Sequence, residues 1–97
     1  AVAATKLCNF LPINYKPKVV IIGAGISGQA AGYFLSQKGI DITILEARSR
    51  LGGRVYSHTI DTGENLTVEL GAEWIGASHQ RVISLCQELG LELHNNQ

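Results

Sequence analysis

The sequence lacks several features that would assign it at once to a class of protein. Its 97 residues include two cysteines, Cys8 and Cys86, which lie far apart and form no Cys-x-x-Cys or Cys/His pattern. We interpret both thiols as buried or idle. Acidic and basic residues balance, and no basic stripe indicates a nucleic-acid partner. The longest apolar run is far shorter than the roughly 20 residues that cross a bilayer, so we expect no transmembrane segment.

Residues typical of acid–base or metal catalysis are also scarce. The three histidines, His58, His79 and His94, are scattered along the chain, and we expect each to be a surface or strand residue. No nucleophile–base pair and no cluster of metal-ligating residues is recognisable. The sequence therefore predicts no catalytic residue and no metal site in this stretch.

The chain does contain a glycine-rich turn between a strand pattern and a helix pattern. Residues 23–28 read Gly-Ala-Gly-Ile-Ser-Gly and follow the apolar run 19–22. This order is typical of a dinucleotide-binding βαβ unit. Gly23 is expected to allow the tight turn, Gly25 to let the backbone approach a pyrophosphate, and Gly28 to let the helix pack closely. The phosphates would lie at a helix N-terminus, which favours negative charge.

The residues that follow continue the same unit. Small and apolar residues at helical spacing, among them Gly32, predict a helix that presses on a sheet, with Gly39 as its C-cap. Residues 40–45 predict a second strand that ends at Glu46. This acid lies about 18 residues past Gly28, close to the spacing of about 20 residues expected for a carboxylate that binds a ribose.

A second glycine site follows the acid directly. Residues 47–54 read Ala-Arg-Ser-Arg-Leu-Gly-Gly-Arg, with three arginines in a seven-residue window. Adjacent glycines, Gly52 and Gly53, permit another close approach of the backbone to a ligand. Arginine offers a planar, permanently charged fork for phosphate oxygens. The alternative interpretation is a flexible, solvated basic turn.

These three motifs together resemble the N-terminal region of the flavin-containing amine oxidase superfamily, which includes monoamine, polyamine and L-amino-acid oxidases. The resemblance covers about residues 18–95. It implies an α/β fold with a Rossmann-like βαβ segment of the glutathione-reductase type, and FAD as the cofactor. It also implies that Glu46 holds the adenosine ribose and that Arg48 and Arg54 lie near the phosphates. The residues implied to bind FAD are Gly23, Gly25, Ile26, Ser27, Gly28, Glu46, Ala47, Arg48, Gly52, Gly53, Arg54, Gly71, Ala72, Glu73 and Trp74.

A hairpin pattern leads into the last of these residues. Residues 55–60 and 66–70 predict two strands around a polar turn. In the resembling family the segment after the hairpin, here 71–76, passes beside the flavin ring, where small residues let the main chain touch it. Trp74 falls where the family often carries an aromatic residue. The alternative for Trp74 is a role in the core.

The end of the chain predicts one more helix and a strand-like segment. Ser78 is expected to cap a structural helix that Gly90 closes, and residues 91–94 are strand-like. We interpret residues 1–17 as an irregular lead-in and residues 18–97 as the N-terminal part of an FAD-binding domain. A single βαβ unit cannot cover both faces of a parallel sheet, so we expect a piece of a larger two-domain protein whose remainder is a partner.

The resemblance implies an FAD-dependent enzyme that oxidises an amine to an imine by hydride-equivalent transfer, with reoxidation by O₂ giving H₂O₂. Many L-amino-acid oxidases carry Gly-Pro-Met-Arg where residues 71–74 here read Gly-Ala-Glu-Trp, and the missing arginine favours an amine over an amino acid. Glu73 could attract a cationic amine or form a structural salt bridge. An L-amino-acid oxidase, a desaturase or porphyrinogen-type flavoenzyme, and a non-enzymatic relative of the Rab escort proteins stay open as alternatives. The first residue, Ala1, allows a processed or a trimmed chain and leaves the compartment unassigned.

Overall fold

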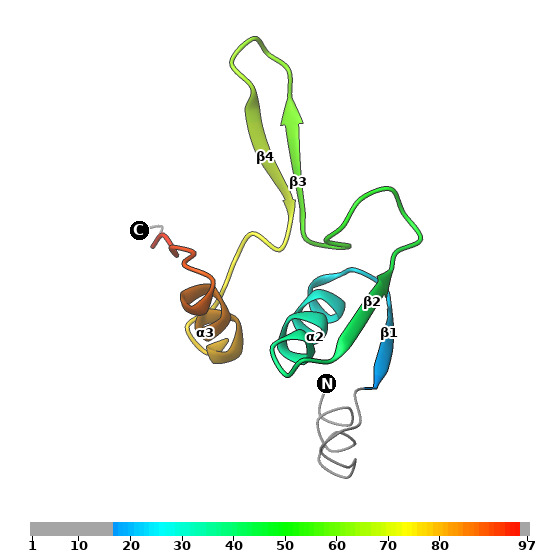
Figure 1. Ribbon diagram of the computed structural model, residues 1–97. Helices are drawn as coiled ribbons and strands as arrows, with labels where there is room; N and C mark the ends of the chain where they lie inside the picture. Colours follow the sequence, from blue (N-terminus) through cyan, green and yellow to red (C-terminus); the bar gives the residue numbers. More distant parts are fainter. Residues whose placement is uncertain (1–16, 96–97) are drawn as a thin grey trace. The chain divides into compact units, whose positions relative to one another are not determined.

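The computed structural model describes residues 17–95, which form two compact units divided between Tyr56 and Ser57 (Figure 1). Cys8 and all of the expected lead-in except Pro17 lie outside the described residues. The helices and strands, in chain order, are β1 Lys18–Ile22, α2 Ile26–Ser36, β2 Asp41–Leu45, β3 Tyr56–Ile60, β4 Leu66–Gly71 and α3 Gln80–Glu88.

The first unit is a βαβ unit, as the sequence predicts. Strands β1 and β2 pair in parallel, with Lys18 opposite Asp41 and Ile22 opposite Leu45. Parallel neighbours cannot be joined by a tight turn and need a crossover connection. Helix α2 is that crossover (Figure 1). The predicted second strand begins one residue later than expected, because Ile40 still belongs to the turn that closes α2.

Helix α2 packs closely on one face of the sheet. Gly32 is buried, and a Cβ atom at this position would lie 2.9 Å from Cδ1 of Ile44. The predicted role of Gly32 is therefore confirmed. Together with Ala24 and Ile40, Leu35 of α2 is a buried apolar residue of the described part.

The end of α2 is closed by a glycine in the left-handed conformation. Gly39 has φ of +74° and donates its N–H to the carbonyl of Ser36 at 2.9 Å. The N–H of Ile40 reaches the carbonyl of Leu35 at 3.3 Å. This pair of bonds is a Schellman motif, which satisfies carbonyls that the helix leaves unpaired. The prediction that Gly39 closes the helix is confirmed.

The second unit contains the predicted hairpin and the last helix. Strands β3 and β4 form a two-stranded sheet, and the hydroxyl of Ser57 donates to the carboxylate of Glu69 across it at 2.7 Å. In the turn, the N–H of Gly63 donates to Oδ1 of Asp61 at 3.2 Å. This Asx-type bond stabilises the polar turn that the sequence predicts between the two strands.

The predicted N-cap of helix α3 is wrong, whereas its predicted C-terminal end is right. Ser78 does not cap the helix. The N-cap is His79, which makes no side-chain capping bond, because its Nδ1 instead accepts the N–H of Gly76 at 3.1 Å. At the other end Gly90 has φ of +71°, and the N–H of Leu91 bonds the carbonyl of Cys86 at 2.8 Å. Cys86 is half-buried.

The strand-like segment 91–94 forms no strand within residues 17–95. Its first N–H group is already bonded to α3, and a strand needs a neighbour that pairs with its backbone. Within the described ranges, no helix has the length and apolar character needed to span a membrane.

Candidate dinucleotide-binding site

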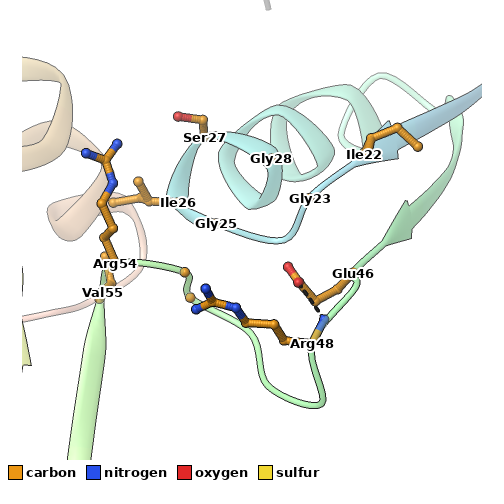
Figure 2. Close-up of a pocket in the computed structure, with 12 residues that line it drawn as sticks. Ile22, Gly23, Gly25, Ile26, Ser27, Gly28, Glu46, Arg48, Arg54 and Val55 are labelled. Atoms are coloured by element: carbon orange, nitrogen blue, oxygen red, sulfur yellow. Dashed lines mark hydrogen bonds between the residues drawn. The ribbon is translucent and has the colours of Figure 1, made fainter.

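The first unit contains a cleft of about 420 Å³ between the β1–α2 turn and the segment that follows β2 (Figure 2). It brings together residues that the sequence places in three separate motifs. Its lining residues are Ile22, Gly23, Gly25, Ile26, Ser27, Gly28, Glu46, Arg48, Gly52, Gly53, Arg54 and Val55. Sequence reasoning missed Ile22 and Val55, although each directly adjoins a predicted motif.

The three glycines of the first motif have three different tasks. Gly23 has φ of +95° and donates its N–H to the carbonyl of Leu45 at 2.7 Å, which ties the turn to the end of β2. A Cβ atom on Gly28 would collide with the carbonyl oxygen of Gly23 and lie 3.3 Å from Cγ2 of Ile21. A Cβ atom on Gly25 would meet no described atom within 4 Å. Gly23 and Gly28 are thus needed by the fold, whereas Gly25 leaves open space in the cleft wall.

Helix α2 presents its N-terminus to this cleft. Ile26, Ser27 and Gly28 form its first turn, and all three line the cleft. The N–H of Gln29 bonds the carbonyl of Gly25 at 3.0 Å. The N–H groups before it belong to the first turn, which has no intrahelical acceptors. These donors and the positive end of the helix dipole favour an anion in the cleft.

The carboxylate of Glu46 is held by two main-chain amides. Its Oε2 accepts the N–H of Ala24 at 2.9 Å, and its Oε1 accepts the N–H of Arg48 at 2.9 Å (Figure 2). The amide of Arg48, followed by that of Ala24, lowers the pKa of Glu46 below its ordinary value, while desolvation opposes the shift. The amide of Ala47 lowers it further. The carboxylate is therefore ionised at neutral pH, and it keeps lone-pair capacity for another donor.

The lowered pKa predicts that acid weakens this part of the fold. The pKa of Glu46 is lower in the folded chain than in the unfolded chain, because the main-chain amides stabilise its charged form. Its contribution to the free energy of unfolding is therefore complete above the unfolded-state pKa and is lost as pH falls through the folded-state pKa. We expect the melting temperature of the native protein to fall more steeply than that of Glu46→Gln as the pH drops below the unfolded-state pKa of the carboxyl. Parallel pH profiles for the two proteins would contradict this assignment.

The second glycine site lies directly against the first. The N–H of Gly52 donates to the carbonyl of Ala24 at 2.9 Å, and Gly25 and Gly52 form a parallel bridge. Gly52 has φ of +101° and Gly53 has φ of +61°, conformations that favour glycine. The N–H of Val55 closes the turn on the carbonyl of Gly52 at 3.0 Å. These bonds tie the second glycine site to the first and hold its main chain.

Two arginines of this segment lie at the cleft. Arg48 and Arg54 both line it, and both are exposed (Figure 2). With Glu46 the only acidic lining residue, the cleft carries a net positive charge that adds to the helix dipole. The charge of the site therefore suits a doubly charged diphosphate. A hydroxyl-rich group beside the diphosphate would donate hydrogen bonds to the carboxylate of Glu46.

Five of the expected site residues do not line this cleft. Ala47 contributes only its amide to Glu46. Gly71, Ala72, Glu73 and Trp74 belong to the second unit, so their approach to a flavin stays a prediction. Glu73 and Trp74 line a different cleft of about 440 Å³, with Ile75 and residues 92–95. Trp74 is 69% exposed, so it is not part of a core formed by the described residues.

Comparison with known proteins agrees with this geometry. Residues 21–89 match the family model described as the NAD(P)-binding Rossmann-like domain. The chain is 42% identical over 82 residues to flavin-containing amine oxidase B of Homo sapiens, which covers 84% of this chain and 15% of that protein. It thus spans about 15% of the length of the curated relatives that it matches.

Solved structures with the same fold include more than one kind of enzyme. Putrescine oxidase, in its wild-type form bound to putrescine, matches with a TM-score of 0.70 and 40% identity, covering 80% of this chain and 17% of that one. A CLA-producing fatty acid isomerase from P. acnes matches with a TM-score of 0.73 and 30% identity, covering 89% of this chain and 20% of that one.

The βαβ unit and its cleft define a dinucleotide-binding α/β segment. The chain belongs to the NAD(P)-binding Rossmann-like domain family and, as its motifs indicate, to the flavin-containing amine oxidase superfamily. The resemblance and the fold class expected from the sequence are both confirmed.

Proposed function

We propose that the cleft binds the adenosine diphosphate half of FAD and that the protein oxidises an amine. One observation carries this proposal. Two glycine segments and the carboxylate of Glu46, which are separate in the sequence, meet in one cleft. Over its matched residues the chain is 42% identical to flavin-containing amine oxidase B and 40% identical to putrescine oxidase.

The residues at the cleft fit the adenosine diphosphate half of FAD. A diphosphate would approach the first turn of α2 beside Gly25. Because Gly25 has no Cβ atom, the space next to its main chain is open to the ligand. Arg48 and Arg54 supply positive charge on the other wall. Glu46 has lone-pair capacity left for ribose hydroxyls, since a carboxylate has about four acceptor sites and main-chain amides do not take all of them. A site of this kind binds and orients the cofactor before any chemistry occurs.

When bound, FAD would supply the redox chemistry, accepting a hydride equivalent from the α-carbon of a neutral amine and delivering the electrons to O₂, so that an imine and H₂O₂ form. This chain would contribute orientation. Residues 71–74 would place main chain beside the flavin ring, where Ala72 already adopts φ of +59°. Glu73 would then supply a negative charge that could attract a cationic amine.

An amine is favoured over other substrates by the relatives rather than by the fold. A fatty acid isomerase shares the fold at 30% identity, so the fold alone does not determine the substrate. The matches to amine oxidase B and putrescine oxidase are higher in identity. Residues 71–74 also contain no arginine that could pair with an amino-acid carboxylate.

The proposal predicts a yellow protein that releases peroxide from amines. We expect the purified protein to show a flavin absorption spectrum and to produce H₂O₂ with primary amines or polyamines. We expect no peroxide with L-amino acids, because residues 71–74 lack the arginine found in many L-amino-acid oxidases. The measurement is a peroxide assay over a panel of both substrate classes.

Three other outcomes of these measurements would each contradict a different part of the proposal. A colourless protein that does not bind added FAD would exclude the cofactor and leave a non-enzymatic relative. Peroxide from L-amino acids alone would overturn the substrate class. A yellow protein that gives no peroxide with either class would favour a desaturase, a porphyrinogen-type enzyme or an isomerase.

A further inference from the structure

Arg50 differs from the other two arginines of its segment. Arg48 and Arg54 line the cleft, whereas Arg50 does not. Arg50 is half-buried, and the other two are exposed. A permanently charged side chain that turns away from an anion site has to find acceptors elsewhere.

The guanidinium of Arg50 binds the second glycine segment itself. Its Nη2 donates to the carbonyl of Gly53 at 2.9 Å, and its Nη1 donates to the carbonyl of Leu51 at 3.3 Å. The two acceptors lie on either side of Gly52. The guanidinium also lies over the ring of Tyr56, 4.2 Å from its centroid. One side chain thus connects the carbonyls of the loop to the first residue of β3.

The loop needs such a restraint because it is built of flexible residues. Gly52 and Gly53 both have positive φ, and glycine loses more conformational freedom on ordering than any other residue. The N–H of Gly52 fixes one point, at Ala24, and Arg50 fixes the carbonyls before and after it. The carbonyl oxygens of Leu51 and Gly53, which would repel phosphate oxygens, are engaged by a cation.

We propose that Arg50 is a positioning residue for the cofactor. It holds residues 51–53 in the conformation that receives the diphosphate, without touching the cofactor itself, and the ring of Tyr56 keeps its guanidinium in place. This inference rests on the proposed FAD site. Lysine cannot replace Arg50 in this role, because an ammonium is a point charge that lacks the planar fork and the stacking face.

The test compares four variants with the native protein. Arg50→Met removes the charge and the fork, Arg50→Lys keeps only the charge, and Tyr56→Leu removes the ring. Arg81→Met is the matched control, since it removes the same charge from an exposed position on α3. The measurements are the dissociation constant of FAD from the apoprotein, by quenching of flavin fluorescence, and the melting temperatures with and without FAD.

We expect Arg50→Met and Arg50→Lys each to weaken FAD binding by about tenfold or more, as hydrogen bonds from a charged donor are the stronger ones. Tyr56→Leu should weaken it less, and combining it with Arg50→Met should add little, because the two side chains act as one unit. Arg81→Met should bind FAD like the native protein. The extra stability that FAD confers should shrink in both Arg50 variants.

Three results would overturn the inference. If Arg50→Lys binds FAD as tightly as the native protein does, Arg50 contributes only its charge and the positioning role is wrong. Equal losses of melting temperature with and without FAD, at unchanged affinity, would reduce it to general stability. Native affinity in Arg50→Met would remove the role altogether. If Arg50→Met does not fold, the Arg50→Lys and Tyr56→Leu variants decide the matter.

The failure of the proposed FAD site is distinguishable from the failure of this inference. If Gly25→Ala and Glu46→Gln bind FAD like the native protein, the FAD site itself is wrong. If those two lose FAD while both Arg50 variants keep it, only the positioning role is wrong.

Discussion

A Gly25→Ala variant is expected to fold normally and to lose most of its affinity for FAD. The backbone of Gly25 has φ of −72°, a value that alanine readily adopts. The added methyl group would meet no described atom within 4 Å. The methyl group would occupy the space through which a diphosphate reaches the first turn of α2. We expect a loss of about a hundredfold in affinity, equivalent to about 2–3 kcal/mol, the range of hydrogen bonds to charged groups. Flavin titration and thermal melting of the apoprotein measure the two effects.

Gly28→Ala is the matched comparison, since it adds the same methyl group three residues later. There the methyl group would meet the carbonyl of Gly23, which is main chain and cannot rotate away. We expect the apoprotein itself to be destabilised by about 3 kcal/mol or more, at the upper end for overpacked sites. A Gly28→Ala protein that melts like the native one, or a Gly25→Ala protein that binds FAD normally, would contradict the tasks assigned to these glycines.

A Glu46→Gln variant is the second change with a large expected effect. The native carboxylate accepts two amide bonds, from Ala24 and from Arg48. A glutamine has one acceptor oxygen, and its NH₂ group would face an N–H donor, so one amide would lose its partner. The turn would lose one hydrogen bond, and the proposed contact with the ribose would lose its charge. We expect FAD affinity to fall by about tenfold to a hundredfold, because a charge-assisted hydrogen bond to the ribose would be lost.

Glu64→Gln provides the control for this change, because Glu64 is an exposed acid in the β3–β4 turn and its loss alters the net charge equally. Isothermal titration with FAD on both variants measures the difference. A Glu46→Gln protein that matches Glu64→Gln would show that the carboxylate has no role in the cofactor site.

Strand β1, helix α2 and strand β2 could be predicted because their signals are local. The apolar run before Gly23, the small residues around Gly32 and the left-handed Gly39 each act within a few residues of their own position. The hairpin was predictable for the same reason, since Asp61 and Gly63 form the turn between themselves. The glycines and the acid of the cleft were predictable from their spacing.

The contacts that hold the cleft together could not be predicted, because they join residues whose proximity the fold creates. Nothing in the sequence around Ala24 indicates that its carbonyl accepts bonds from both Gly52 and the side chain of Gln29. The three arginines look alike in the sequence, and only the fold separates Arg50 from the other two. The cap by Ser78 failed similarly, since His79 is engaged by a loop amide.

The bond between Ala24 and Gly52 has a consequence for the transfer of this site to other proteins. A chimera that grafts only the strand, the first glycine turn and helix α2 would leave the carbonyl of Ala24 without the amide of Gly52 and the N–H of Ala24 without the carboxylate of Glu46. The smallest graft that keeps these bonds runs from Lys18 through Tyr56, the ring of which supports Arg50. Recombination points for building hybrid proteins of this fold therefore belong after Tyr56, not between the two glycine segments.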